Sequence, residues 1–295
     1  MRTFAFLINP AANRWKSDEL HTRLRSEIEG RWPGSAIMLS RKPGHIAGLA
    51  KEAAGRYDAV VACGGDGTVR EVASVLRHTD TLMGILPAGS GNDFRKSLGI
   101  PRDLEGALDI LENGTPAEVD MGLCNEIPFV NTLGIGFDGM TNRLAAESGL
   151  LHGGLRYAWA ALRANFMIKP WKARIWMGEQ LQERQLLMLT AANGRVEGGS
   201  FTIAPDASVT DGLLDFILLR PVSRALLPIL LPIVTQGMHR RLPQLEMWQT
   251  SRLELELEGP VMMHADGETV NPEGTRLTIT CLPKALRILV PEPLK

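Results

Sequence analysis

The chain has 295 residues, of which 44% are hydrophobic, and its formal net charge at pH 7 is −1. This length and composition are typical of a globular protein with one large domain or two ordinary ones. The near-zero charge lacks the basic character of nucleic-acid-binding proteins, so we expect no nucleic-acid partner.

The cysteines and the apolar segments indicate a cytoplasmic protein. Cys63, Cys124 and Cys281 form no CxxC pair or Cys/His cluster, which argues against a zinc site and favours reduced thiols in the core. The apolar run at 3–8 is followed by no cleavage-like sequence and is interpreted as a strand. The most apolar later segment, 225–234, contains two prolines and is about half as long as a membrane-spanning helix.

The first 120 residues alternate between apolar runs and helix-like stretches. Strands are expected at 3–8, 35–39, 58–63 and 82–86, and helices at 17–30, 44–55, 67–77 and 103–112. Alternation at this spacing predicts βαβ units and a parallel sheet with helices on both faces. Ligands of such sheets bind beyond the C-terminal ends of the strands.

The sequence after Asp120 has a different pattern. Strands are expected at 129–136, 173–179, 185–191, 201–204, 213–219, 245–258 and 275–281, and helices near 139–147, 154–167 and 224–238. Alternating apolar and polar residues predict antiparallel sheets with one covered face and one wet face. We therefore expect a second, sandwich-like domain that begins near 121–128, and a last strand at 285–290 that fits either domain.

Small and polar residues follow three of the expected N-terminal strands. Asn9-Pro10 follows the first strand, the GGDGT motif at 64–68 follows the third, and a glycine-rich segment at 84–94 contains the end of the fourth. Because parallel strands end at one edge of their sheet, these loops are expected to converge. Glycines let the backbone approach a ligand, and the helix that begins near Gly67 presents free N–H groups, so the loops predict a phosphate site.

Acidic residues accompany these glycines. A carboxylate such as that of Asp66 repels phosphate unless a cation lies between them, and magnesium accepts oxygen ligands from both. Asp93 and Asp120 supply two further acids, and the combination predicts a phosphotransferase that uses a nucleotide and magnesium. The alternative interpretation of the GGDG sequence is a tight turn without a ligand. The chain contains no Walker A motif and no GxGxxG motif after the first strand.

An ordered set of motifs resembles the diacylglycerol kinase catalytic-domain family of lipid kinases, which includes sphingosine kinases and bacterial lipid kinases. The motifs are NP at 9–10, GGDGT at 64–68, PxGSGNDF at 87–94, VDxG at 119–122, FxN at 129–131, GxGxD at 134–138, DGxL at 211–214 and DGE at 266–268. The resemblance covers nearly the whole chain and implies an α/β plus β fold. An N-terminal NAD-kinase-like α/β domain at 1–122 is expected to bind ATP, and a C-terminal antiparallel β-sandwich domain at 123–284 to accept the lipid. Residues 285–295 are expected to return to the first domain.

The resemblance also implies roles for individual residues. Asp66, Asp93 and Asp120 match acids that organise the catalytic Mg²⁺, and Glu268 matches the general base that takes the proton from the lipid hydroxyl. Asp211, with main-chain oxygens near Ser208 and Leu213, matches a structural Mg²⁺ site of bacterial members. The ATP-contacting positions match Asn9, Ser40, Gly64, Gly65, Asp66, Gly67, Thr68, Val69, Arg70, Ser90 and Asn92. The first loop, NPAAN, departs from the family pattern because Asn13 replaces a glycine.

Some of these residues have plainer interpretations. Without the resemblance, Asp266 and Gly267 are interpreted as a hairpin turn, Glu268 as a solvated strand residue and His264 as a structural histidine. The segments 150–177 and 224–242 combine apolar faces, cations and, in the first, tryptophan, as helices at a membrane interface do. Alternatively, both segments cover the core of the sandwich.

The expected function is that of a magnesium-requiring lipid kinase that transfers the γ-phosphoryl group of ATP to a hydroxyl of diacylglycerol or a related lipid. We expect it in the cytoplasm, peripherally at the inner membrane surface, and the resemblance leaves a homodimer open. The alternatives are an NAD kinase, which shares the GGDGT motif, and a catalytically inactive module that binds a nucleotide or a lipid.

Overall fold

The computed structural model describes residues 2–12, 18–148, 153–178 and 180–294. The chain divides into two compact units, Met1–Val119 with Lys284–Lys295, and Asp120–Pro283. We call them unit 1 and unit 2 and describe each by itself. No helix in the described ranges is both long enough and apolar enough to span a bilayer.

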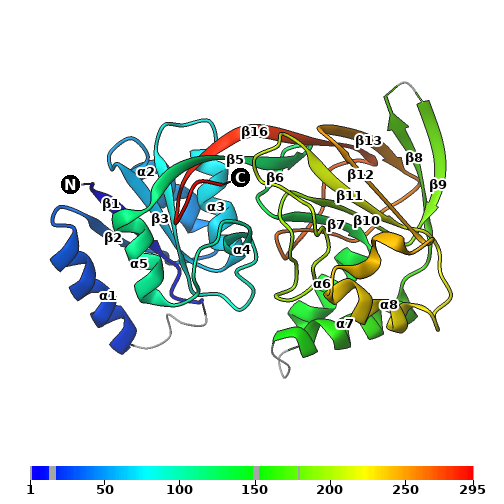
Figure 1. The fold of residues 1–295 in the computed structure, drawn as a ribbon, viewed down its shortest axis with the longest axis horizontal. Coiled ribbons are helices and arrows are strands. Elements are labelled where there is room, and N and C mark those ends of the chain that lie inside the picture. Colours follow the sequence, from blue (N-terminus) through cyan, green and yellow to red (C-terminus); the bar gives the residue numbers. More distant parts are fainter. Residues whose placement is uncertain (1, 13–17, 149–152, 179, 295) are drawn as a thin grey trace. The chain divides into compact units, whose positions relative to one another are not determined.

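Unit 1 is built around a parallel sheet of apolar strands (Figure 1). β1 pairs with both β2 and β3, and β4 extends the sheet beyond β3. The bounds are β1 Phe4–Ile8, β2 Ala36–Leu39, β3 Ala59–Gly64 and β4 Leu82–Pro87. Every residue of β1, β3 and β4 is buried, as expected for a parallel sheet that is covered on both faces.

Helices alternate with these strands along the chain. They are α1 Asp18–Arg31, α2 His45–Ala53, α3 Asp66–Leu76, α4 Phe94–Ser97 and α5 Leu104–Asn113. In α3 the buried residues Val69, Val72, Ala73 and Leu76 recur every three or four positions, which gives one apolar side to the sheet. All predicted strands and helices of this half begin and end within two residues of their predicted positions, and the predicted α/β class is confirmed.

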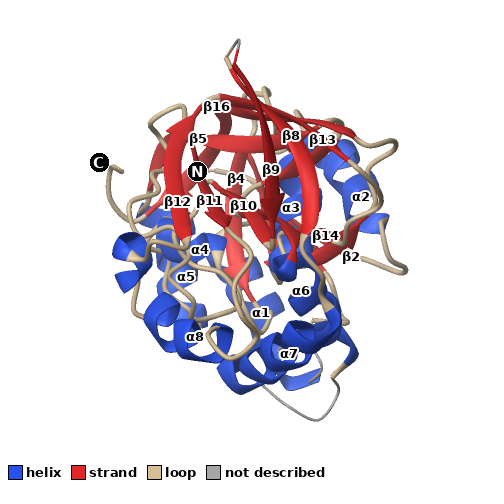
Figure 2. Ribbon diagram, turned by 90° about the vertical axis from the view of Figure 1, so that its right-hand side faces the viewer, coloured by secondary structure: helices blue, strands red, loops and turns tan. Residues whose placement is uncertain are grey.

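Unit 2 contains two antiparallel layers of strands, with helices along one of them (Figure 2). One sheet has the order β12-β11-β10-β7-β14-β15. The other layer contains β9, β8, β13 and the first part of β16, and β5 pairs with β16 and β6. The bounds are β5 Thr115–Cys124, β6 Ile127–Phe129, β7 Thr132–Gly136, β8 Trp171–Met177, β9 Gln180–Leu186, β10 Met188–Ala192, β11 Leu214–Leu219, β12 Leu245–Thr250, β13 Arg252–Leu257, β14 Met263–Ala265, β15 Glu268–Val270 and β16 Arg276–Val290.

Two apolar cores hold unit 2 together. The first lies between the two layers and includes Ile135, Phe216 and Leu255, so the layers form a sandwich. The second lies between the other face of the β7–β10–β11 sheet and the helices, and includes Leu144 and Leu227. These helices are α6 Phe137–Glu147, α7 Gly153–Met167, α8 Leu227–Thr235 and the 3₁₀ helix η2 Met238–Arg241.

The strand predictions in the second half differ from the structure in detail at several places, whereas the segment 285–290 has one of the placements expected for it. The segment 201–204 forms no strand and makes only an isolated bridge. The segments 185–191 and 245–258 each span two strands that a single residue separates, and the two strands of each pair belong to different layers of unit 2. The sequence pattern does not mark the residue at which the chain passes from one layer to the other. The segment 285–290 is the second part of β16 and pairs with β4 of unit 1.

Candidate functional site

Two glycine-rich loops of unit 1 touch each other backbone to backbone. Gly65 follows β3 and Gly89 lies just beyond β4, and these strands are parallel neighbours. A Cβ atom added at Gly89 would lie 2.5 Å from the Cα of Gly65, and one added at Gly64 would lie 2.3 Å from Thr68 Oγ1. The loops therefore meet only because these positions carry no side chain.

Asp66, the first residue of α3, binds the second loop to the first. Its Oδ2 accepts the backbone N–H of Asn92 at 2.8 Å, and its Oδ1 accepts that of Asp93 at 2.7 Å. Asn92 has a φ of 50°, and its side-chain amide bonds to both the N–H and the C=O of Gly89. The structure thus brings together three predicted site residues from two separate strand ends.

The carboxylates of Asp66 and Asp93 both lie close to Gly91. A Cβ atom at Gly91 would lie 2.8 Å from Asp66 Oδ2 and 3.4 Å from Asp93 Oδ2, so a side chain at position 91 would fill the space between them. Lys96 Nζ lies 2.6 Å from Asp93 Oδ1 and offsets part of the negative charge. Carboxylate oxygens are the ligands that Mg²⁺ prefers, so this pair could hold such an ion.

The N-terminus of α3 lies at the same edge of the sheet. Its first N–H groups have no intrahelical partner, and its dipole favours an anion there. Asn9 follows β1, and its Nδ2 donates to Thr68 Oγ1 at 3.3 Å. The N–H of Ser40 donates to the carbonyl of Ile8, which places Ser40 beside the end of β1. This edge therefore combines helix N–H groups with polar side chains, as a phosphate site requires.

The remaining predicted nucleotide contacts differ in exposure. Ser90 is exposed, and Gly67 and Arg70 are half-buried near the start of α3. Val69 is buried in the core of unit 1, so its side chain packs against the sheet. Asn13, where the first loop departs from the family pattern, lies outside the described residues.

In unit 2, Asp120 on β5 holds the loop that carries the DGxL motif. Asp120 is buried, and its Oδ2 accepts the backbone N–H of Gly212 at 2.7 Å. Asp211 Oδ1 accepts the N–H of Leu213 at 2.9 Å, and Ser208 belongs to the same loop. The three residues predicted for the structural metal therefore share one loop, whereas the grouping of Asp120 with the acids of unit 1 stays a prediction.

The DGE motif forms the turn between β14 and β15. Asp266 and Gly267 have φ values of 49° and 84°, as a tight hairpin turn requires. The buried Asp266 carboxylate accepts the backbone N–H groups of residues 130–132 at 2.8 to 3.0 Å. Glu268 follows the turn as an exposed residue at the start of β15. The turn is thus anchored by Asp266, and the role of Glu268 as a base stays a prediction.

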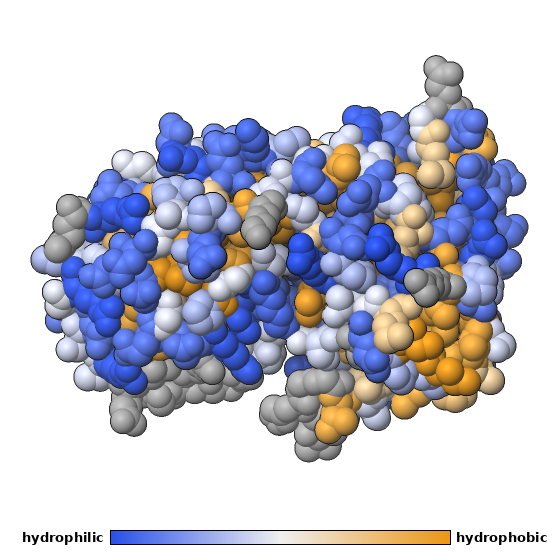
Figure 3. Space-filling model, in the orientation of Figure 1, coloured by the Kyte–Doolittle hydropathy of each residue, from blue (hydrophilic) through white to orange (hydrophobic). Residues whose placement is uncertain are grey.

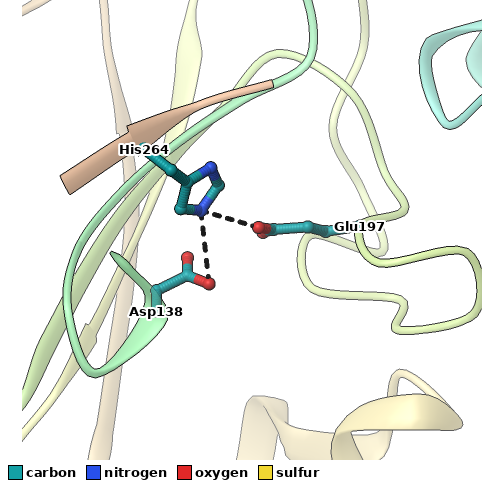
Figure 4. Close-up of side chains that lie close together, drawn as sticks. All are labelled: Asp138, Glu197 and His264. Carbon is teal, nitrogen blue, oxygen red and sulfur yellow. Dashed lines mark ion pairs between the residues drawn. The ribbon is translucent and has the colours of Figure 1, made fainter. Parts of the chain in front are cut away.

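A cluster of one buried and two half-buried side chains was not among the predicted site residues (Figure 4). His264, on β14, is fully buried, and its Nε2 lies 2.8 Å from Glu197 Oε1 and 3.4 Å from Asp138 Oδ1. The imidazole nitrogen is aligned with neither carboxylate as a well-formed hydrogen bond, so both contacts are ion pairs. Asp138 Oδ2 also accepts the hydroxyl of Thr190 at 2.6 Å.

One glycine in the sequence signals this cluster. A Cβ atom at Gly134, inside β7, would lie 2.3 Å from Asp138 Oδ2 and 2.3 Å from His264 Nε2. A glycine within a strand often marks the close approach of other atoms. Glu197 lies in a loop after β10 and carries no such signal, which is why sequence patterns do not find it.

The cluster changes the protonation of its members. Burial acts to lower the pKa of His264, but Glu197 and Asp138 outweigh it and raise this pKa well above the usual value. Burial acts to raise the pKa of Asp138, but the His264 charge and hydrogen bonds outweigh it and lower this pKa. The two shifts favour an ion pair between the side chains of His264 and Asp138.

Asp138 and Glu197 line a pocket within unit 2. The pocket has a volume of about 800 Å³, counting the part that is open to solvent. Much of its wall comes from α7, α8, β10 and β11 and is apolar, with Ala161, Met188, Ile217, Leu219, Leu227 and Leu230 among the lining residues. An apolar pocket with a few polar groups is suited to a small amphiphilic ligand.

Two family models match the chain. The diacylglycerol kinase catalytic domain matches residues 3–124, and the YegS C-terminal NAD kinase beta sandwich-like domain matches residues 131–290. A diacylglycerol kinase of Mycobacterium tuberculosis is 32% identical over 250 residues, which cover 82% of this chain and 80% of that protein.

Solved structures share the fold. A diacylglycerol kinase from Bacillus anthracis has a TM-score of 0.74 at 20% identity, over 98% of this chain and 97% of that chain. An NAD kinase from Archaeoglobus fulgidus, solved in complex with ATP, has a TM-score of 0.54 at 14% identity, over 98% of this chain and 94% of that chain. These likenesses confirm the predicted NAD-kinase-like fold. The matches to both halves of the chain, together with the identity to the mycobacterial enzyme, show that this protein is a kinase of the diacylglycerol kinase catalytic-domain family.

Proposed function

We propose that the protein uses ATP and magnesium to phosphorylate a hydroxyl group of diacylglycerol or a related lipid. The observation that carries this proposal is the junction at Asp66, where two glycine-rich loops meet at the N-terminus of α3. Backbone N–H groups and a paired carboxylate site within one loop junction are what a nucleotide–magnesium complex requires. The name of the mycobacterial relative motivates the choice of diacylglycerol.

Unit 1 is proposed to hold the nucleotide. Gly65, Gly67 and the first N–H groups of α3 bind the phosphates, with Asn9 and Ser90 at the rim of the same edge. Asp66 and Asp93 would hold the catalytic magnesium, for which Asp120 also stays a predicted ligand. When bound, the ion neutralises the charge that develops on the transferred phosphoryl group. The proposed second ion at the loop of Asp211 has a structural role only.

Unit 2 is proposed to hold the acceptor. The acyl chain occupies the apolar pocket beneath α7 and α8. Glu268 accepts the proton of the attacking hydroxyl, since its carboxylate lies exposed on a turn that Asp266 keeps rigid. The lipid oxygen then bonds to the γ-phosphorus, and ADP leaves.

The outer side of α7 and α8 supports contact with a membrane surface (Figure 3). Leu155, Phe166 and Met167 of α7 and Ile229 of α8 are between 51% and 75% exposed. The segments 153–172 and 220–241, which contain these helices, hold eight lysine and arginine residues and no aspartate or glutamate. Exposed apolar side chains among cations bind the interface of an anionic bilayer. We call these side chains the apolar face of α7 and α8.

The proposal is tested by transfer of label from γ-labelled ATP with magnesium. The acceptors are vesicles that contain diacylglycerol, phosphatidylglycerol or a long-chain amino alcohol, and NAD is the soluble acceptor. We expect label on a lipid, lost in Asp66→Ala and Glu268→Ala and kept in Glu258→Ala, whose side chain is exposed and paired with Lys172. Label on NAD alone, or on no acceptor at all, would overturn the proposal.

A further inference from the structure

Among the described residues that line the apolar pocket, two have acidic side chains, Asp138 and Glu197, and none is a lysine or an arginine. We propose that this carboxylate pair is the headgroup-recognition site of the acceptor pocket. It selects an amphiphile whose head donates hydrogen bonds, either a hydroxyl or an ammonium group, and rejects an anionic head. The inference rests on the proposed function only in calling this amphiphile the acceptor.

His264 acts as a positioning residue for the pair. It is fully buried and does not line the pocket, so it contacts the carboxylates from the protein side. Its ion pairs fix Glu197, which comes from a loop, beside Asp138, which comes from the first turn of α6. The absence of a side chain at Gly134 provides the room for this arrangement.

The geometry favours an organic donor over a metal ion. The side-chain oxygens and Nε2 of the three residues lie within 4.8 Å of one another, as metal ligands do. However, the N–H of Gly267 lies 3.3 Å from His264 Nδ1, so a neutral imidazole carries its proton on Nε2. The imidazolium carries a proton there as well. In both states Nε2 carries a proton and has no lone pair for a cation.

A histidine that lines the pocket itself also offers a hydrogen-bond acceptor to a ligand. His239 is buried, and burial lowers its pKa, so the ring is neutral. Its Nε2 lies 2.9 Å from the carbonyl oxygen of Ile203 and must therefore donate, which leaves Nδ1 as an acceptor. Nδ1 has no hydrogen-bond partner within the described part of the chain. A buried acceptor without a partner is costly, and a donor on the ligand would satisfy it.

The carboxyl groups of Asp138 and Glu197 and the Nδ1 of His239 determine which ligand heads bind well in the pocket. A phosphate, sulfate or carboxylate head would bring its negative charge beside the Asp138 carboxylate, whose pKa is lowered. A hydroxyl or ammonium head would instead donate to an ionised acceptor, which is the stronger kind of hydrogen bond. One such bond corresponds to a difference in affinity of roughly tenfold to a hundredfold.

The test measures binding of three probes with the same chain and different heads. Decanol, decylamine and decanoate are titrated into the full-length protein by calorimetry, without ATP. We expect decanol, decylamine or both to bind at least about tenfold more tightly than decanoate, and Glu197→Gln to reduce this ratio by roughly tenfold. Glu256→Gln changes a half-buried glutamate on β13, which pairs with Arg174 outside the pocket, and should leave the ratio unchanged. Asp138→Asn is the second variant if Glu197→Gln does not fold.

Each result of these titrations either supports or overturns the proposed headgroup site. Tighter binding of decanol identifies a hydroxyl head, and tighter binding of decylamine identifies an ammonium head. Equal or tighter binding of decanoate, an unchanged ratio in both pocket variants, or no binding of any probe overturns the inference. Because the assay involves no phosphoryl transfer, its result is independent of whether the protein labels any lipid. His264→Gln should reduce the same ratio, which a merely structural histidine would not do.

Discussion

Asp66 accepts the backbone N–H of Asp93 at 2.7 Å, although 27 positions separate the two residues along the chain. The carboxylate of Asp66 therefore stabilises the fold whether or not a ligand is bound. It fixes the loop after β4 against the start of α3, beside Asp93, with which it is proposed to hold the metal. Stability and phosphoryl transfer are coupled at this one side chain.

The first prediction concerns this coupling. In Asp66→Asn, an amide N–H₂ replaces one acceptor oxygen and faces the N–H of Asn92 or Asp93. We expect the free energy of unfolding to fall by about 1–3 kcal/mol and label transfer to fall by roughly a hundredfold or more. Urea denaturation and the transfer assay measure the two effects. Asp80→Asn, at a fully exposed side chain, should change neither, and wild-type transfer in Asp66→Asn would contradict the prediction.

The second prediction concerns the contact between the two loops. In Gly89→Ala the added Cβ meets the Cα of Gly65, and backbone cannot move aside as a side chain can. We expect a loss of at least about 2 kcal/mol in the free energy of unfolding. The matched control is Gly48→Ala in α2, where the nearest side-chain atom lies 4.0 Å away. That variant should gain roughly 0.5–1 kcal/mol, and equal effects of the two changes would refute the loop contact.

The third prediction separates the roles of the DGE residues. Glu268→Gln should lower label transfer by roughly 10²–10⁴-fold with an unchanged melting temperature, because the side chain is exposed. Asp266→Ala leaves three buried N–H groups without an acceptor and should destabilise the protein by about 3 kcal/mol or more. Melting curves and transfer rates of both variants are compared. A large drop in melting temperature for Glu268→Gln would argue against the role of a base.

The fourth prediction concerns the apolar face of α7 and α8. Phe166 is 67% exposed, so Phe166→Glu should fold normally. A carboxylate there opposes both insertion and the attraction of the neighbouring cations, and we expect vesicle binding to fall by roughly tenfold or more. Cosedimentation with anionic vesicles measures this binding. Leu39→Glu places the same charge at an apolar residue of β2 that is 48% exposed and should bind as the wild type does.

The fifth prediction concerns the pH dependence of stability. The pKa of His264 is raised in the folded protein, so its ion pairs stabilise the fold fully below the usual histidine pKa of 6.5. This contribution is lost as the pH rises through the raised folded value. The melting temperature of the wild type should therefore exceed that of His264→Gln most at about pH 6, and the difference should shrink in the alkaline range. His45→Gln is the control, and a difference that grows with pH would have the wrong sign.

The α/β half was predictable because its signals are local. A buried parallel strand needs an unbroken apolar run, and the helix after it needs an apolar side at helical spacing, so both patterns are visible within ten residues. The edge where Asn9, Asp66 and Asp93 lie follows from the same rule, since parallel strands end together. The GGDGT and GSGND motifs could be recognised in the sequence because only glycine allows two backbone segments to approach so closely.

Tertiary structure decided what depends on distant neighbours. The division of 245–258 into two strands and the continuity of β16 depend on pairing partners, which an alternating pattern does not name. The cluster of Asp138, Glu197 and His264 joins a helix, a loop and a strand that lie far apart in the sequence. Composition and spacing along the chain indicate which chemical groups are present and which elements carry them. The partner of a charged group and the shift of its pKa are decided only by folding, which removes water and brings another charge beside it.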